Sequence, residues 1–456
     1  MSDEHENILK VRDDHDFIKL VMEDDGQKFK IETEQNVDWC PEKTCSKSDL
    51  RSRVEPWLTS LFQSEHLSLL VGSGLTTAIQ CEACGSGNNG MCGGSEFTVF
   101  SDEINVAASE SAKALGRNEA NIEDKIRVAN EVIKGLSVLR DCKDFPYIGD
   151  KIDNLQKNLE NIICKFTDNI SKIESSIARA ESEKRESAFN KLVSFLMSFA
   201  SRAGTRDRLN IFTTNYDRLI EAGADVAGIR LIDRFVGALS PIFRSSRMDV
   251  DMHYNPPGIR GEPRYLEGVA RFTKLHGSLD WIKVGEDIRK IGIPFGTNSI
   301  KTFLKEVGIG SKYSSLMIYP NSAKDRETAE YPYVELFRDF AAALCRPNST
   351  LVTYGYSFGD DHINRVIRDM LTIPSTHLVV IDYNDSTGRI LDKYSTWGRK
   401  TQMSLIIGKD ISNITDLVDY YLPKPSIDRT SIRMADILRQ RFYDSSNAVL
   451  NGEKKK

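Results

Sequence analysis

The stretch Leu67-Ser68-Leu69-Leu70-Val71-Gly72-Ser73-Gly74-Leu75-Thr76 decides the fold that the sequence predicts. An apolar run followed by Gly-x-Gly is typical of a buried parallel strand that enters a tight turn. Glycines at such a turn let the backbone approach a phosphate closely, and the amide N–H groups that follow can donate to an anion. Ordinary strand-to-helix turns also use Gly-x-Gly, so this stretch alone leaves nucleotide binding open.

Three later stretches place polar residues at or just after apolar runs. In an open α/β sheet, ligands bind at the carboxyl ends of the strands, where these residues would lie. Together with the first turn, they favour a nucleotide site built from several strand ends. The stretches are Phe212-Thr213-Thr214-Asn215-Tyr216-Asp217, Lys274-Leu275-His276-Gly277-Ser278 and Thr353-Tyr354-Gly355-Tyr356-Ser357-Phe358-Gly359-Asp360-Asp361.

Apolar runs alternate with helical patterns along much of the chain. This alternation predicts an α/β fold with a doubly wound parallel sheet. The expected strands cover residues 67–71, 209–214, 272–275, 316–319, 351–354, 378–382 and 403–407, and the clearest helices cover 333–344 and 361–371.

A block of helical texture, residues 104–200, interrupts the alternation and predicts a large helical insertion. Within it, apolar residues repeat at steps of four and three, as in paired or coiled-coil helices. Such a seam should meet another helix, either inside the insertion or on a neighbouring subunit. We expect a homo-oligomer to which the insertion contributes contacts. The seam consists of Leu155, Leu159, Ile162, Phe166, Ile170, Ile173 and Ile177.

Charge is spread unevenly along the 456 residues. Residues 1–36 hold eleven acids and five bases, while the whole chain has a formal net charge of -5. The rest is therefore near neutral, with no bulk signature of nucleic-acid binding. We expect residues 1–50 to form an acidic arm, either a small ribbon or, as the simpler interpretation, a solvated tail. We expect the nucleotide-binding sheet domain over residues 51–424 and a helical C-terminal tail over 425–456.

Membrane and metal signals are weak. No apolar run reaches the length of a membrane-spanning helix, and the polar N-terminus is unlike a signal peptide. We therefore expect a cytoplasmic protein without membrane contact, whose eight cysteines are thiols or metal ligands. Cys81, Cys84 and Cys92 could ligate zinc. The dense glycine and asparagine around them favour a flexible loop over the nucleotide pocket instead, and we expect no metal.

A few residues at the expected strand ends can carry chemistry. Asn215 is a neutral amide that can hold a water or a ribose hydroxyl, and Asp217 follows two residues later. His276 is a natural general base near neutral pH. Asp382 can accept hydrogen bonds from a ribose. Each has a plainer alternative, since residues 214–217 also suit a helix N-cap, His276 a structural histidine and Asp382 a turn.

In this order, the motifs resemble those of the sirtuin family, which are NAD-consuming enzymes with a Rossmann-like core. Gly72-Ser73-Gly74-Leu75-Thr76 resembles the family's Gly-Ala-Gly-Ile-Ser, Thr214-Asn215-Tyr216-Asp217 its Gln-Asn-Ile-Asp, and Gly355-Tyr356-Ser357 its Gly-Thr-Ser. Leu275-His276-Gly277 matches the family's Leu-His-Gly. The resemblance implies that Asn215 and Asp217 act on the nicotinamide side and that His276 is the base. It also implies that NAD binds at Gly72, Ser73, Gly74, Thr76, Thr214, Gly355, Ser357 and Asp382.

One departure separates this chain from the protein deacylases of that family. Those enzymes carry a four-cysteine zinc ribbon soon after the His-Gly, whereas residues 277–344 hold no cysteine here. The pattern instead resembles bacterial sirtuin-like domains of antiphage defence, which hydrolyse NAD to nicotinamide and ADP-ribose. This resemblance implies an NAD glycohydrolase with a separate hexameric HerA-like ATPase as its partner. An NAD-dependent deacylase or ADP-ribosyltransferase and a non-catalytic nucleotide-sensing assembly module are the alternatives.

Overall fold

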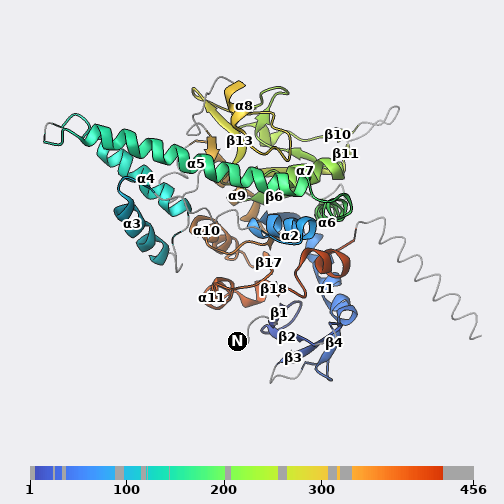
Figure 1. Ribbon diagram of the computed structural model, residues 1–456. Helices are drawn as coiled ribbons and strands as arrows, with labels where there is room; N and C mark the ends of the chain where they lie inside the picture. Colours follow the sequence, from blue (N-terminus) through green and yellow to red (C-terminus); the bar gives the residue numbers. More distant parts are fainter. Residues whose placement is uncertain are drawn as a thin grey trace, which may run out of the picture.

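Strands and helices alternate around one large sheet in the structure, which is a computed structural model (Figure 1). The C-terminal tail expected over residues 425–456 and Cys92 lie outside the described residues. The structure describes residues 6–23, 26–32, 37–87, 97–114, 120, 122–142, 144–200, 207–254, 264–306, 316–318 and 331–424.

The large sheet has eleven strands in the order β4-β3-β2-β1-β18-β17-β16-β5-β6-β12-β7. Neighbours from β18 to β7 are parallel, and neighbours from β4 to β18 are antiparallel. The strands are β1 (Glu6–Lys10), β2 (Ile18–Met22), β3 (Lys28–Glu32), β4 (Thr44–Ser46), β5 (His66–Val71), β6 (Leu209–Thr213), β7 (Arg230–Ile232), β12 (Val269–Lys274), β16 (Ser349–Tyr354), β17 (His377–Asp382) and β18 (Met403–Ile407).

The parallel part of the sheet is doubly wound around β5. From β5 the chain adds β6 and then β12 on one side, and it later adds β16, β17 and β18 on the other. The order reverses between β5 and β16, and ligands of open α/β sheets bind at such a switch point. The predicted α/β, Rossmann-like parallel sheet is confirmed, and the strands expected at 67–71, 209–214, 272–275, 351–354, 378–382 and 403–407 all belong to it.

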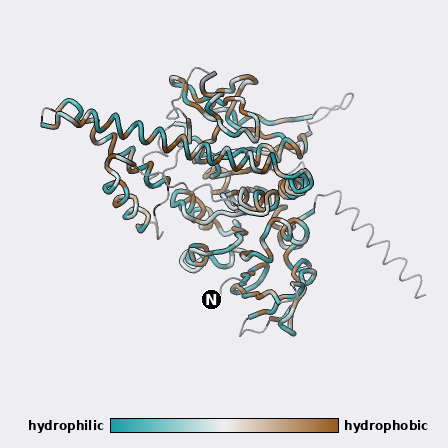
Figure 2. Tube along the Cα trace, in the orientation of Figure 1, coloured by the Kyte–Doolittle hydropathy of each residue, from teal (hydrophilic) through white to brown (hydrophobic). Residues whose placement is uncertain are grey.

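Helices cover both faces of the parallel strands, which explains their continuous apolar runs. In β5, Leu69 and Val71 face a core formed with α1, α2, α6 and α7, whereas Leu70 faces a core formed with α9, α10 and α11. Apolar segments accordingly gather along the sheet and on the inner sides of the helices (Figure 2). The helices are α1 (Lys47–Phe62), α2 (Ser73–Cys84), α3 (Ser101–Ala114), α4 (Ile122–Ser137), α5 (Ile148–Ala178), α6 (Ser182–Ala200), α7 (Leu219–Ala227), α8 (Lys301–Glu306), α9 (Tyr333–Leu344), α10 (Asp361–Met370), α11 (Arg389–Thr396) and α12 (Ile414–Asp416).

The N-terminal segment is part of the sheet, so the expected solvated tail is wrong for its described residues. β1 pairs antiparallel with β18, with Ile8 opposite Ile407, and β2, β3 and β4 extend the sheet beyond it. Leu20 and Phe29 are fully buried. The alternative of a small ribbon is therefore the one that the structure shows, and the ribbon caps one edge of the parallel strands.

The helical insertion is an arm of α3, α4 and α5 that extends from one end of the sheet (Figure 1), followed by α6. The apolar seam of α5 is buried inside the chain itself. From Leu155 to Ile170 it packs in one cluster with α3, α4 and β13 (Gly277–Val284), a strand of a second sheet. Ile173 and Ile177 pack in the core between the large sheet and α1, α2, α6 and α7. Of the two partners expected for the seam, the structure shows the one inside the chain.

A second, five-stranded sheet has the order β15-β13-β14-β9-β8 and packs against α9 and α5. It corrects one expectation: the run at 316–319 is not a strand of the parallel sheet, because β15 pairs antiparallel with β13. The remaining strands are β8 (Phe235–Val236), β9 (Ile242–Phe243), β13 (Gly277–Val284), β14 (Asp287–Lys290) and β15 (Leu316–Ile318), together with the separate hairpin of β10 (His253–Tyr254) and β11 (Arg264–Tyr265).

The Cys-x-x-Cys pair lies on a helix. Cys81 and Cys84 belong to the last turn of α2, which ends at Gly85 in the left-handed conformation, so the expected flexible loop is wrong at these two positions. Both side chains are exposed. Among the described residues, no group of three or more His, Cys, Asp or Glu side chains is arranged to hold a metal ion.

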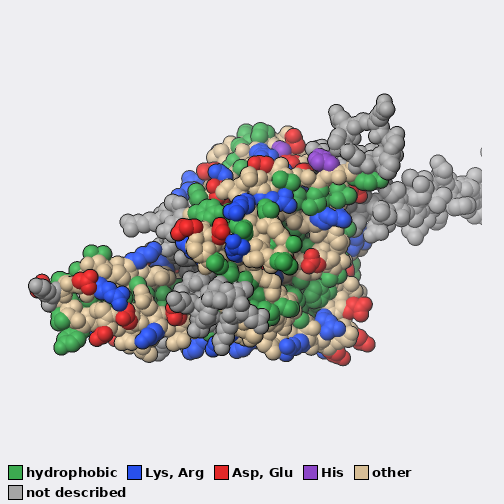
Figure 3. Space-filling view, turned by 90° about the horizontal axis from the view of Figure 1, so that it is seen from above, with side chains coloured by type: hydrophobic (Ala, Val, Ile, Leu, Met, Phe, Trp, Pro, Cys, Tyr) green, Lys and Arg blue, Asp and Glu red, His purple; other side chains and the backbone are tan. Residues whose placement is uncertain are grey.

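The face seen from above shows mixed charge: Lys and Arg side chains and Asp and Glu side chains are scattered over it, with apolar side chains between them (Figure 3). None of the described helices combines the length and the apolar character needed to cross a bilayer.

Candidate functional site

The glycine turns after β5 and β16 pack directly against each other at the switch point. Gly74 N donates to Gly355 O at 3.1 Å, and Gly72 N donates to Tyr354 O at 3.0 Å. A Cβ on Gly72 would lie 2.2 Å from Gly355 O, and a Cβ on Gly355 would lie 2.5 Å from Gly74 Cα. Gly355 also has a φ of +60°, which favours glycine. The close contact of the two turns therefore requires these glycines, besides any role in approaching a phosphate.

Three hydroxyl-bearing residues expected at the site lie at this same end of the sheet. Ser73 is the first residue of α2 and is exposed, as is Ser357 after β16. Thr214 is partly buried, and its N–H donates to Val71 O at 3.2 Å, which joins the ends of β5 and β6. The exposed hydroxyls thus flank the N-terminus of α2, where partial positive charge favours an anion.

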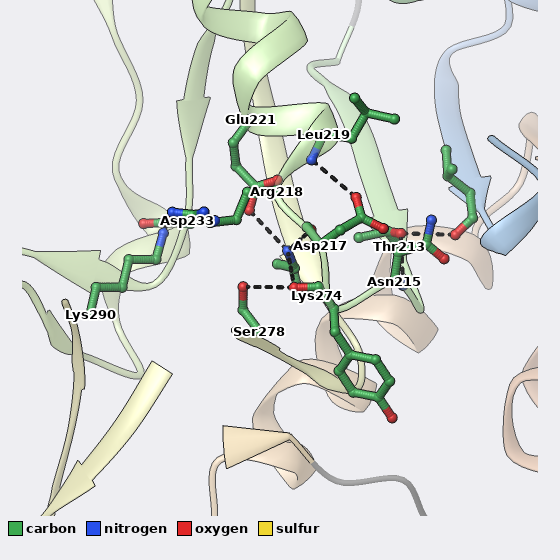
Figure 4. A network of polar contacts seen from close by, with 12 residues as sticks. Thr213, Asn215, Asp217, Arg218, Leu219, Glu221, Asp233, Lys274, Ser278 and Lys290 are labelled. Atoms are coloured by element: carbon green, nitrogen blue, oxygen red, sulfur yellow. Dashed lines mark hydrogen bonds and ion pairs between the residues drawn. The ribbon is translucent and has the colours of Figure 1, made fainter. Parts of the chain in front are cut away.

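Asn215, Asp217 and Thr76 form a buried cluster between the ends of β5 and β6. Asn215 Nδ2 donates to Gly72 O at 2.9 Å and to Thr76 Oγ1 at 3.0 Å. Thr76 Oγ1 in turn donates to Asp217 Oδ2 at 2.7 Å. Figure 4 shows Asn215 beside Thr213, whose Oγ1 accepts from Asn215 N, and Asp217 beside Leu219. The cluster fixes the loop of residues 214–218, called the 214–218 loop below, against the first turn of α2.

The helix-cap interpretation of these residues also holds in part. Asp217 Oδ1 accepts a hydrogen bond from Leu219 N at 3.0 Å, at the start of α7. The two carboxylate oxygens of Asp217 thus make different contacts: Oδ1 accepts at the start of α7, and Oδ2 accepts from Thr76 in the cluster.

A buried ammonium group supports the 214–218 loop from below (Figure 4). Lys274 Nζ, at the end of β12, donates to Tyr216 O at 3.4 Å and also to Asp217 O. Glu221 Oε1 accepts from the same nitrogen at 3.1 Å. Burial raises the pKa of Glu221, and the positive charge of the nearby Lys274 opposes this rise. This arrangement holds two main-chain carbonyls of the loop in place from the next strand of the sheet.

His276 follows β12 and pairs with Asp360, which lies within the quoted stretch 353–361 but has no role of its own assigned from the sequence. His276 Nε2 lies 2.9 Å from Asp360 Oδ2. Asp360 also caps α10, since its Oδ1 accepts from His362 N at 3.1 Å and from Ile363 N at 3.5 Å. An aspartate just before a predicted helix signals an N-cap, but nothing in the sequence reveals its contact with a histidine 84 residues away. A carboxylate so placed fixes the orientation of the imidazole ring.

Tyr216 connects the two halves of the site. Its ring centroid lies 6.3 Å from that of His276, and its neighbours in the chain belong to the Asn215–Asp217 cluster. The fold thus brings Gly72, Gly74, Thr76, Asn215, Asp217 and Gly355 into one contact network, with His276 beside it.

Asp382 lies one strand farther from β5, at the end of β17. Its side chain is partly buried, and burial raises its pKa to about 7. The main-chain carbonyl of the same residue accepts from Gly408 N and Ser412 Oγ, which fixes the backbone at this strand end. Asp382 therefore occupies the same edge as the cluster, without a described contact to it.

The raised pKa of Asp382 makes a pH dependence of nucleotide binding testable. Most molecules carry a neutral Asp382 at pH 6 and a carboxylate at pH 8, and the charged carboxylate is the stronger hydrogen-bond acceptor. If Asp382 holds a ribose, the KM for NAD should fall by up to about tenfold between these pH values. In Asp382→Asn, this dependence should disappear.

Steady-state kinetics at pH 6 and pH 8 check this prediction. The same ratio of KM values in both proteins would contradict a role of Asp382 in binding.

The raised pKa of Asp382 also has a consequence for the stability of the protein. Because the folded state binds this proton more tightly, the contribution of Asp382 to stability should decline as the pH rises from about 3.8 to about 7.

Part of the chain matches a known protein family. Residues 209–400 match the family described as SIR2-like domain. The chain thus contains a SIR2-like domain, which indicates NAD-related activity and an NAD-utilising enzyme in general. The matched residues include Asn215, Asp217, His276, Asp360 and Asp382, whereas the Gly72–Thr76 turn precedes them. A search of curated proteins finds no match.

Proposed function

We propose that the protein is an NAD glycohydrolase, which cleaves NAD to nicotinamide and ADP-ribose. The observation that carries this proposal is the convergence of the Asn215–Thr76–Asp217 cluster and the His276–Asp360 pair at the switch point of a sheet with a SIR2-like domain. The start of α2, with the exposed hydroxyls of Ser73 and Ser357, would hold the pyrophosphate. Asp382 would hold the adenosine ribose.

The chemistry requires positioning more than acid catalysis. The bond between the anomeric carbon and the nicotinamide nitrogen breaks, and nicotinamide leaves as a neutral molecule without a proton. A water oxygen then bonds to the anomeric carbon, and the proton of that water passes to His276 as the general base. Asn215 would hold the water or the ribose hydroxyls, and Asp217 would orient Asn215 through Thr76.

The alternative of a protein deacylase finds less support. After His276 the chain forms the β13–β14 hairpin of the second sheet, where that class of enzyme carries its zinc ribbon. A deacylase or ADP-ribosyltransferase would release nicotinamide only with an acyl-lysine peptide or an acceptor protein. A nucleotide-sensing module would bind NAD without cleaving it.

The test is to incubate the purified protein with NAD and to measure free nicotinamide and ADP-ribose by chromatography. We expect equimolar release of both without any acceptor. Release that depends on an acyl-lysine peptide would point to a deacylase. NAD that is bound but stays intact, even with the HerA-like ATPase added, would point to a sensing module.

The biological setting belongs to the same proposal. We propose that NAD depletion in the cytoplasm serves antiphage defence and that basal activity is low. A homo-oligomer and a separate hexameric HerA-like ATPase would then raise that activity. Because the seam of α5 is buried, any subunit contacts of the insertion would use other residues. Light scattering and the same assay with the ATPase added would test this part.

A further inference from the structure

The helical insertion reaches the 214–218 loop from two sides. From α4, Glu123 Oε1 accepts the hydrogen bond of the Tyr216 hydroxyl at 3.2 Å. From α5, Glu174 Oε1 accepts from Arg218 N at 2.7 Å, and Glu174 Oε2 accepts from the Arg218 guanidinium at 2.5 Å. The contact from α4 thus involves Tyr216, just before Asp217, and the contact from α5 involves Arg218, just after it. Both helices therefore hold the loop that carries Asn215.

The contact from α5 is a buried ion pair. Glu174 is 1% exposed and Arg218 is 8% exposed. Burial raises the pKa of Glu174, and the hydrogen bonds from Arg218 oppose this rise. The guanidinium also donates to the main-chain carbonyls of Ile293 and Pro294. A buried charge without its partner is costly, so the loop cannot shift at Arg218 unless α5 moves with it.

The contact from α4 acts close to His276. Tyr216 is buried, and its ring packs edge to face on Phe166 of α5 at a centroid distance of 5.7 Å. The ring of His276 also lies beside this ring, at a centroid distance of 6.3 Å. Tyr216 is thus fixed by the insertion at its hydroxyl and at its ring, and its backbone belongs to the loop.

We infer that Glu123 and Glu174 of the insertion are positioning residues for the site, because they hold the 214–218 loop in the geometry that NAD cleavage requires. This inference rests on the proposed function. Neither carboxylate reaches the reacting atoms in this account, and the phosphate-holding turns after β5 and β16 are bonded to each other without a described contact to either carboxylate. Loss of the Glu123 contact should therefore lower kcat for NAD hydrolysis and leave KM nearly unchanged.

The experiment compares Tyr216→Phe, Glu123→Ala and Glu123→Gln in the full chain. Tyr216→Phe and Glu123→Ala each remove a hydrogen bond to a charged group, and kcat should fall by about ten- to a hundredfold. Glu123→Gln keeps an acceptor oxygen and should stay within about threefold of the wild type. Glu131→Ala is the matched control: it removes a carboxylate from the same helix, where Glu131 pairs only with Arg127 among the described contacts.

Amide hydrogen exchange supplies a readout that does not depend on catalysis. The N–H groups of residues 216–218 should exchange at least about tenfold faster in Glu123→Ala than in Glu131→Ala. Glu174→Gln should show the same effect at Arg218, since it keeps the geometry but removes the charge. If Glu123→Ala does not fold, the kcat and the amide exchange of Tyr216→Phe decide whether the inference holds.

The outcomes separate the two claims. Absence of nicotinamide release from the wild type, alone and with the HerA-like ATPase added, would refute the proposed function, and the exchange rates would then decide the inference alone. Unchanged kcat in Tyr216→Phe and Glu123→Ala of an active enzyme, with unchanged exchange in the loop, would overturn the inference and leave the proposed function standing.

Discussion

His276→Ala and Asn215→Ala are each expected to lower nicotinamide release from NAD by about two to four orders of magnitude, since each removes a base or a positioned group. His276 lies against Asp360, and Asn215 joins Gly72 to Thr76, so both side chains sit where strand ends meet. The measurement is the initial rate of nicotinamide release, with the melting temperature recorded for each variant. His253→Ala, at an exposed histidine of β10, is the control.

The two variants differ in what else they disturb. Asn215→Ala leaves Gly72 O and Thr76 Oγ1 without one hydrogen-bond donor each, so a modest loss of stability is expected. His276→Ala leaves the carboxylate of Asp360 without its imidazole partner, although its helix cap remains. Wild-type turnover in both variants, at unchanged melting temperature, would refute the assignment of the site.

Gly355→Ala is expected to lower the free energy of unfolding by about 2–5 kcal/mol. Two effects add: an alanine at a φ of +60° costs about 1–2 kcal/mol, and its methyl group would lie 2.5 Å from Gly74 Cα, where overpacking costs about 1–3 kcal/mol. The neighbouring atoms are backbone, which cannot rotate away. Equilibrium unfolding in urea measures the change.

Gly388→Ala separates the two effects. Gly388 has a φ of +68°, but a Cβ there would meet no atom within 4 Å. This variant should therefore lose only the conformational part, about 1–2 kcal/mol. Equal losses in the two variants would show that the contact between the turns after β5 and β16 is not as close as described.

The parallel core could be predicted from the sequence because its signal is local. Strands buried on both faces read as continuous apolar runs, and each of these runs ends in a turn with glycine or a polar residue, as Leu67 to Gly74 does. Ligands of open α/β sheets bind at the carboxyl ends of the strands, so residues that follow an apolar run are candidates for the site. Gly72, Asn215 and His276 could therefore be chosen before their contacts were known.

The missed features depend on long-range pairing. β1 to β3 are short, and β3 alternates charged and apolar residues, so only pairing through β1 with β18 shows that they belong to the sheet. β15 is a run of three apolar residues, which does not reveal the sheet that it joins. The contacts of Asp360 with His276 and of Glu123 with Tyr216 likewise join residues far apart in the chain.

The central claim is that this chain cleaves NAD without an acceptor, and one measurement tests it most directly. Purified wild type and His276→Ala are incubated with NAD for several hours, and nicotinamide and ADP-ribose are quantified together. The account predicts equimolar release of both products by the wild type, and at least about a hundredfold less by His276→Ala. NAD that stays intact with the wild type, alone and with a hexameric HerA-like ATPase added, would contradict it.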